Sequence, residues 1–101
     1  MEALQVLADP VRLGIVESLA REPASVGLLA ERFPISRPAI SRHLRLLREA
    51  GLVDSVADGT RHVYRVRPEG LAALREYMDE LWREASARYA LVAENLPEER
   101  P

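Results

Sequence analysis

Cysteine and lysine are both missing from this 101-residue chain, and no apolar run in it approaches the length of a bilayer span. The absence of cysteine excludes disulfides, thiolate metal sites and thiol redox switches. The first residues, 1–5, lack the basic start and apolar stretch of a secretory signal, so we expect a cytoplasmic protein without a membrane partner. The remaining composition, 48% apolar and 30% charged, is typical of one globular domain of this length.

Charge is distributed unevenly along the chain. The formal net charge is -2, yet residues 37–67 contain seven arginines against three acidic residues. The rest of the chain is correspondingly acidic. A locally basic segment suits DNA binding, because phosphate neutralisation requires only local positive charge. Ordinary mixed surface charge is the alternative, and this signal alone does not decide between them.

The first third of the sequence predicts three short helices. Residues 1–8 carry apolar residues compatible with a helix that has one broad apolar face. Asp9 is an N-cap, followed by a proline at the first position of a helix over residues 10–21. Ser25 is expected to cap a third helix, which Pro34 ends.

A fourth helix is predicted from the N-cap Ser36 to about Ala50. Ile40, Leu44 and Leu47 recur at helical spacing and are expected to face the core. The arginines of the same segment lie elsewhere around the helix. One face therefore packs, and another is free to bind.

Two strands and a last helix complete the prediction. Gly51 is placed to end the fourth helix in the left-handed conformation, and residues 52–56 and 60–66 are strand-like runs around a hairpin signal, Asp58-Gly59. Pro68 then opens a long helix that reaches about Asn95. We predict a single domain over residues 1–96 and a flexible tail over residues 97–101.

The order of these elements describes a mainly helical fold with a small β-hairpin, the winged helix-turn-helix. Its fourth helix fits the major groove, where arginine can bind guanine and small side chains can approach other base edges. Double-stranded DNA is therefore the expected partner. The residues predicted to contact it are Ser36, Arg37, Ala39, Ser41, Arg42, His43, Arg45 and Arg61.

Two of these residues have a second interpretation. For His43, bracing the helix against its neighbour or contacting the DNA backbone is favoured over reading a base. Arg61 follows the hairpin turn and is placed to reach the minor groove or its phosphates. A solvated hairpin charge is a nearly equal alternative for Arg61.

Three motifs resemble the ArsR/SmtB family of bacterial repressors. They are residues 9–13 in the second helix, 40–53 in and after the fourth, and 59–66 in the hairpin. The likeness covers nearly the whole chain, and the run Ser-Arg-His-Leu followed by Leu-Arg-Glu-Ala-Gly-Leu-Val is specific for this family among winged helices. The resemblance implies a homodimer joined through its first and last helices, a palindromic operator, and repression by blocking polymerase access.

The last helix independently favours dimerisation, because it is too long for one side of a small domain to cover. We expect part of its apolar stripe to fill the monomer core, and filling that core is the alternative interpretation of Met78 and Trp82. The rest of the stripe needs a second surface. The residues predicted at the dimer interface are Leu4, Leu7, Leu74, Tyr77, Met78, Leu81, Trp82, Ala85 and Tyr89.

The resemblance does not extend to a metal-sensing site. Many family members hold a metal through cysteines in the third helix or through Asp, Glu and His on the last helix. This chain has no cysteine, and its two histidines are His43 and His62. We therefore expect no metal and no cofactor, as in the metal-independent branch of the family, although oxygen-only coordination of a hard ion stays open. The effector is left unassigned, and an apolar ligand between the last helices is a less favoured alternative to an ordinary dimer core.

Two other classes of function fit the sequence less well. A winged helix that serves only as a protein-interaction module is expected to have few arginines on its fourth helix, unlike this one. An enzyme needs a nucleophile with a base, paired carboxylates or a phosphate-binding glycine loop, and none of these is present. Ser41 and His43 are too close along one helix to face each other.

Overall fold

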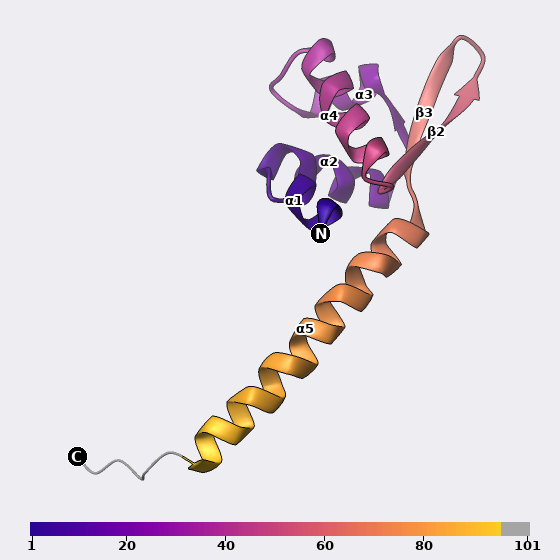
Figure 1. The fold of residues 1–101 in the computed structure, drawn as a ribbon. Coiled ribbons are helices and arrows are strands. Elements are labelled where there is room, and N and C mark those ends of the chain that lie inside the picture. Colours follow the sequence, from indigo (N-terminus) through magenta and orange to yellow (C-terminus); the bar gives the residue numbers. More distant parts are fainter. Residues whose placement is uncertain (96–101) are drawn as a thin grey trace.

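The five helices and the hairpin follow one another in the predicted order in the computed structural model, which describes residues 1–95 (Figure 1). The mainly helical fold with a hairpin wing is thereby confirmed. The predicted tail, residues 97–101, lies outside the described residues. The elements are α1 (Glu2–Leu7), α2 (Pro10–Arg21), β1 (Ala24–Ser25), α3 (Val26–Arg32), α4 (Arg37–Glu49), β2 (Val53–Asp58), β3 (Arg61–Val66) and α5 (Pro68–Asn95).

Side-chain caps begin three of the helices where they were predicted. The Asp9 carboxylate accepts hydrogen bonds from the backbone N–H groups of Val11 at 2.8 Å and Arg12 at 3.2 Å, which starts α2. The hydroxyls of Ser25 and Ser36 accept from backbone N–H groups in the first turns of α3 and α4. Each cap satisfies donors that have no partner inside the helix.

Strand β1 was not predicted from the sequence. β1 has only two residues, and it pairs antiparallel with β3, with Ala24 opposite Tyr64. The sheet therefore has three antiparallel strands in the order β1-β3-β2. Two residues carry no alternation pattern, so β1 exists only because the distant β3 supplies its hydrogen-bond partners. Gly59, with φ +66°, lies in the two-residue turn between β2 and β3.

The hydrophobic core lies among α2, α3, α4 and the adjoining ends of the sheet. Ile40, Leu44 and Leu47 of α4 are at most 1% exposed, as their spacing predicted. The buried residues are Ala3, Ile15, Val16, Leu19, Ala24, Leu29, Ile40, Leu44, Leu47, Leu52 and Val53.

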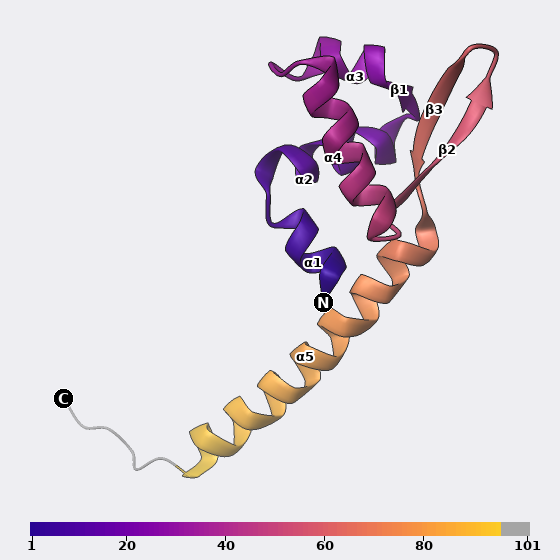
Figure 2. The same cartoon turned by 45° about the horizontal axis from the view of Figure 1, so that its top comes forward.

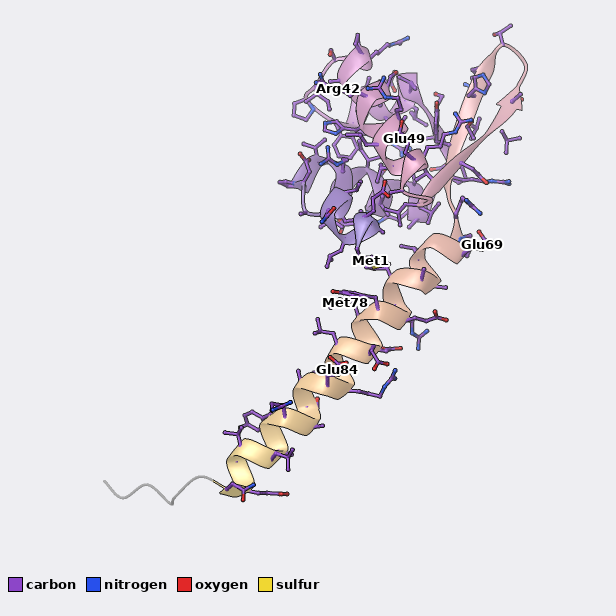
Figure 3. All side chains as sticks on the ribbon, viewed as in Figure 1. Met1, Arg42, Glu49, Glu69, Met78 and Glu84 are labelled. Atoms are coloured by element: carbon purple, nitrogen blue, oxygen red, sulfur yellow. The ribbon has the colours of Figure 1, made fainter. Side chains whose placement is uncertain are left out.

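Helix α5 leaves this core and projects away from it (Figures 1 and 2). The radius of gyration is 19.1 Å, against about 13 Å for a compact domain of this size. No α5 residue within the described range is buried, and Trp82 is 72% exposed. The expectation that part of the stripe fills the monomer core is therefore wrong. Only the first turns of α5 contact the rest of the domain, and they lie near α1. Figure 3 shows Met78 and Glu84 on the part of the helix that runs clear of the domain.

The joint between α5 and the domain depends on two glycines. Gly51 has φ +77°, the left-handed conformation predicted for the end of α4. A Cβ at Gly70 of α5 would collide with the carbonyl oxygen of Gly51. The backbone N–H of Arg67 donates to the Leu52 carbonyl at 2.9 Å beside this contact. The first turn of α5 therefore packs directly on the turn that follows α4.

Within residues 1–95, no helix combines the length and the apolar character needed to cross a membrane.

Candidate nucleic-acid interface

Helix α4 has a buried side and a basic side. The buried side is the Ile40, Leu44 and Leu47 row, and Ser36 caps the first turn. Ser41 and Arg42 are exposed, while Ala39 is half-buried. Arg42 is labelled in Figure 3. The exposed arginines of this helix are Arg37, Arg42, Arg45 and Arg48.

The α4 arginines differ from those of the wing in their ion pairs. Among the described residues, none of the four on α4 pairs with a carboxylate. On the wing and just after it, Arg61 lies 3.6 Å from Asp58, Arg65 lies 2.8 Å from Asp54, and Arg67 lies 3.5 Å from Glu69. The uncompensated positive charge of the basic segment is therefore concentrated on α4.

The Arg65 pair holds the two wing strands together. Its Nε donates to the Asp54 carboxylate across the hairpin, where the two residues are register partners. That hydrogen bond, with the charge of Asp54, raises the pKa of Arg65. Arg65 is thus a structural residue of the wing, and it was not among the residues predicted to contact DNA.

A groove of about 360 Å³ connects α4 with the wing. It brings together Arg37 and Arg61, two predicted DNA-contacting residues that are 24 positions apart in sequence. The guanidinium of Arg37 lies over Gly27, where an added Cβ would be 3.4 Å from its nitrogen. The lining residues are Ser25, Val26, Gly27, Arg37, Arg61, His62 and Tyr64. Three of them are basic types, and none is acidic.

His43 takes the bracing position that was favoured for it. Its Nδ1 lies 3.3 Å from Nη1 of Arg12 on α2, and its side chain is half-buried. Sequence reasoning missed Arg12, as it missed the contribution of Gly27 and His62 to the groove. These partners come from other elements. Arg12 and His62 lie in motifs of the family resemblance, but a motif does not show which distant residue each of them contacts.

The residues predicted at a dimer interface fall into two groups. Those on α5 lie within about 140° of the helix circumference at 100° per residue. They form one apolar face, exposed except at the half-buried Leu74: Leu74, Tyr77, Met78, Leu81, Trp82, Ala85 and Tyr89. On α1, Leu4 is 41% exposed. Leu7 is half-buried and packs against the core of its own domain, so it offers less surface than predicted.

Within the described part of the chain, no three His, Cys, Asp or Glu side chains are grouped so that they could hold a metal ion.

Comparison with known sequences gives a consistent result. Residues 7–56 match a family model described as a helix-turn-helix domain. The chain is 51% identical over 88 residues to the HTH-type transcriptional regulator Rv2034 of Mycobacterium tuberculosis, covering 87% of this chain and 82% of that protein. It is 36% identical over 97 residues to the arsenical resistance operon repressor of Escherichia coli, covering 95% of this chain and 83% of that protein.

Solved structures have the same fold. An ArsR-like transcriptional regulator from Rhodococcus sp. RHA1 superposes with a TM-score of 0.83 at 31% identity, covering 97% of this chain and 92% of that one. A homodimeric winged helix-turn-helix DNA-binding domain from Mycobacterium bovis superposes with a TM-score of 0.66 at 25% identity, covering 99% and 83%.

Proposed function

The chain belongs to the ArsR family of winged helix-turn-helix transcriptional regulators, and on that premise we propose that it represses transcription as a homodimer on a palindromic operator. The observation that carries the proposal is the division of α4 into a buried apolar side and an exposed side rich in arginine. One face is anchored in the core, and the other presents four arginines without a carboxylate partner in the described structure.

The proposed roles on α4 follow from the size and charge of its side chains. Arg37 and Arg42 make bidentate contacts to guanine, and Ala39 and Ser41 approach neighbouring base edges closely. Arg45 binds phosphate, and Ser36 caps the helix end that enters the groove. His43 stays against Arg12 and supports the helix from behind.

The wing supplies the adjacent contact. Arg61 pairs with Asp58, and both side chains are about two-thirds exposed. Exposed ion pairs contribute only about 0–1 kcal/mol, so DNA phosphate can replace the Asp58 carboxylate at little cost. Their shared groove supports the proposal that Arg61 and Arg37 contact one DNA strand.

The dimer is proposed from the exposed face of α5. A helix in water is stabilised mainly by packing of its apolar face, and no residue of this face is fully buried in the monomer. The homodimeric neighbour supports pairing of two chains. A twofold dimer presents two α4 helices to equivalent half-sites, so the operator is an inverted repeat. Bound at a promoter, such a dimer blocks polymerase access.

Release from DNA is proposed to need no metal. Family sites that use thiolates need cysteine, which this chain lacks, and both histidines lie outside α5. Two α5 carboxylates, Asp79 and Glu80, pair instead with arginines of the same helix. Addition of Zn²⁺ is expected to leave operator binding unchanged, and the effector stays unassigned.

The deciding experiment selects bound sequences from a random duplex pool and measures the stoichiometry of the complex by sedimentation. We expect an enriched inverted repeat bound by two chains. Weak binding without enrichment would contradict the proposal and favour a protein-interaction module. An Arg37→Ser/Arg42→Ser double variant, selected in parallel, is the matched control, because both side chains are exposed and their loss leaves the core intact.

A further inference from the structure

One arginine of α2 contacts two other helices, α1 and α4, through a single side chain. Arg12 lies in the first turn of α2, and its side chain is only 19% exposed. Its Nε donates to the Val6 carbonyl of α1 at 2.8 Å, and its Nη1 lies 3.3 Å from Nδ1 of His43 on α4. Asp9 of the α2 cap lies 3.9 Å from the same guanidinium.

The contact with Val6 satisfies a carbonyl group at the end of α1. The Val6 carbonyl is in the last turn of α1, where carbonyl groups have no partner inside the helix, so Arg12 acts as a cap from another helix. Guanidinium is planar and holds its donors in a rigid fork. The two bonds therefore fix α1 and α4 against each other through one flat group.

The contact with His43 also bears on the tautomer of that ring. Arginine has donors and no acceptor, so Nδ1 of His43 must accept in this contact. A neutral imidazole in this position carries its proton on Nε2. A protonated ring has no acceptor and would place two cations side by side.

We propose that Arg12 is a positioning residue that fixes the DNA-reading helix α4 against the dimerisation helix α1 by donating to the Nε2–H tautomer of His43. This inference rests on the proposed function. Helix α1 contacts both α4 and α5, so Arg12 lies between the surface that pairs two chains and the helix that reads DNA. In a dimer, the spacing of the two α4 helices depends on these Arg12 contacts, which we call the Arg12 tie.

The first test reads the tautomer directly in the unbound protein. The chain has two histidines, His43 and His62, so a long-range ¹H–¹⁵N spectrum of the imidazoles resolves both. At a pH of about 8, where imidazoles are ordinarily neutral, we expect His43 as the Nε2–H tautomer in the wild type and loss of that fixed state in Arg12→Gln. A His43 ring that carries its proton on Nδ1 in the wild type would overturn the proposal.

The second test measures affinity for the most enriched duplex from the selection experiment. We expect Arg12→Gln to bind about tenfold more weakly per folded dimer, the lower end for losing a charged hydrogen bond, and Arg12→Lys to be intermediate because one ammonium cannot reach both acceptors in the same geometry. Arg32→Gln is the control. It removes the same charge and a similar bond, from Arg32 to Ser18 at 3.0 Å, and we expect wild-type binding.

Equal affinity of Arg12→Gln and Arg32→Gln would overturn the proposal. A wild-type protein that selects no DNA would refute the proposed function, whereas the tautomer spectrum of the free protein would still decide whether the tie exists.

Discussion

The arginines of this domain differ in whether they form an ion pair with a carboxylate. Those of α4 have no carboxylate partner within residues 1–95, and their guanidinium donors are free for phosphate or guanine. Arg65 is committed to Asp54, and that bond closes the hairpin. The sequence shows one basic segment, but the structure pairs the arginines of only its second half with carboxylates.

Arg42→Ala is expected to weaken binding to the selected operator by about 1–3 kcal/mol, because a bidentate contact to a base is lost. Binding to random DNA should change less. Fluorescence anisotropy with both duplexes measures the difference. Arg75→Ala is the control, since it removes an exposed arginine from α5. Equal losses on both duplexes would instead make Arg42 a phosphate contact.

The cap residue Asp9 predicts a pH dependence of stability. The backbone N–H of Arg12, then that of Val11, together with the charge of Arg12, lowers the pKa of Asp9 in the folded state. The stability from this charged cap is therefore present above the unfolded value of about 3.9 and is lost as the pH falls through the folded pKa.

Asp9→Asn keeps an N-cap without the charge. The difference between the two proteins in free energy of unfolding should be largest near about pH 7 and shrink below about pH 4. Urea unfolding at both pH values measures it. A difference that stays constant with pH would show that the charge of Asp9 contributes nothing.

Helices α4 and α5 are both amphipathic, but they differ in whether the apolar face is buried within the domain. Helix α4 buries its apolar row within its own domain. Helix α5 has 28 residues, about 42 Å at 1.5 Å per residue, and contacts its domain only near one end. The joint at Gly51 and Gly70 therefore sets the direction in which the whole exposed face points.

Gly70→Ala should destabilise the protein, against the usual trend. Alanine ordinarily stabilises a helix interior by about 0.5–1 kcal/mol over glycine. Here its Cβ would meet the Gly51 carbonyl, which is backbone and cannot move aside, so we expect a loss of about 1–3 kcal/mol. Denaturant unfolding measures it, with Ala72→Gly in the same exposed turn to calibrate propensity alone. A Gly70→Ala protein at least as stable as the wild type would refute this close contact.

The whole molecule is 67 Å long and 20 Å across its shortest axis. Such a shape leaves the α5 face in water, with Tyr89 76% exposed. Aromatic side chains in such a patch are typical anchors of an interface. This exposed face is the surface that a second copy of α5 covers in the proposed dimer.

Leu81→Asp is expected to separate the dimer. A carboxylate in the centre of the apolar face should raise the dissociation constant at least about 30-fold, which corresponds to about 2 kcal/mol. Sedimentation velocity over a concentration series measures it. Ala90→Asp places the same charge on the other side of α5 and should still dimerise. A wild-type protein that stays monomeric at micromolar concentration, or a Leu81→Asp protein that pairs like Ala90→Asp, would contradict the proposed interface.

Features that depend on neighbouring residues could be predicted from the sequence alone. The bounds of α2, the caps Asp9 and Ser36, the left-handed Gly51 and the buried row of α4 are all confirmed. Each depends on a proline, a cap, a glycine or a spacing within a few positions. The roles of single residues in DNA binding and dimerisation stay predictions.

Features that need a distant partner were decided by the tertiary structure. Strand β1 forms only against β3, and His43 meets Arg12 across 31 positions. The pattern of α5 shows that its stripe must be covered, but only the fold shows that the monomer fully buries none of it. Local sequence determines which groups a segment must satisfy, whereas the packing of the chain determines which residues satisfy them.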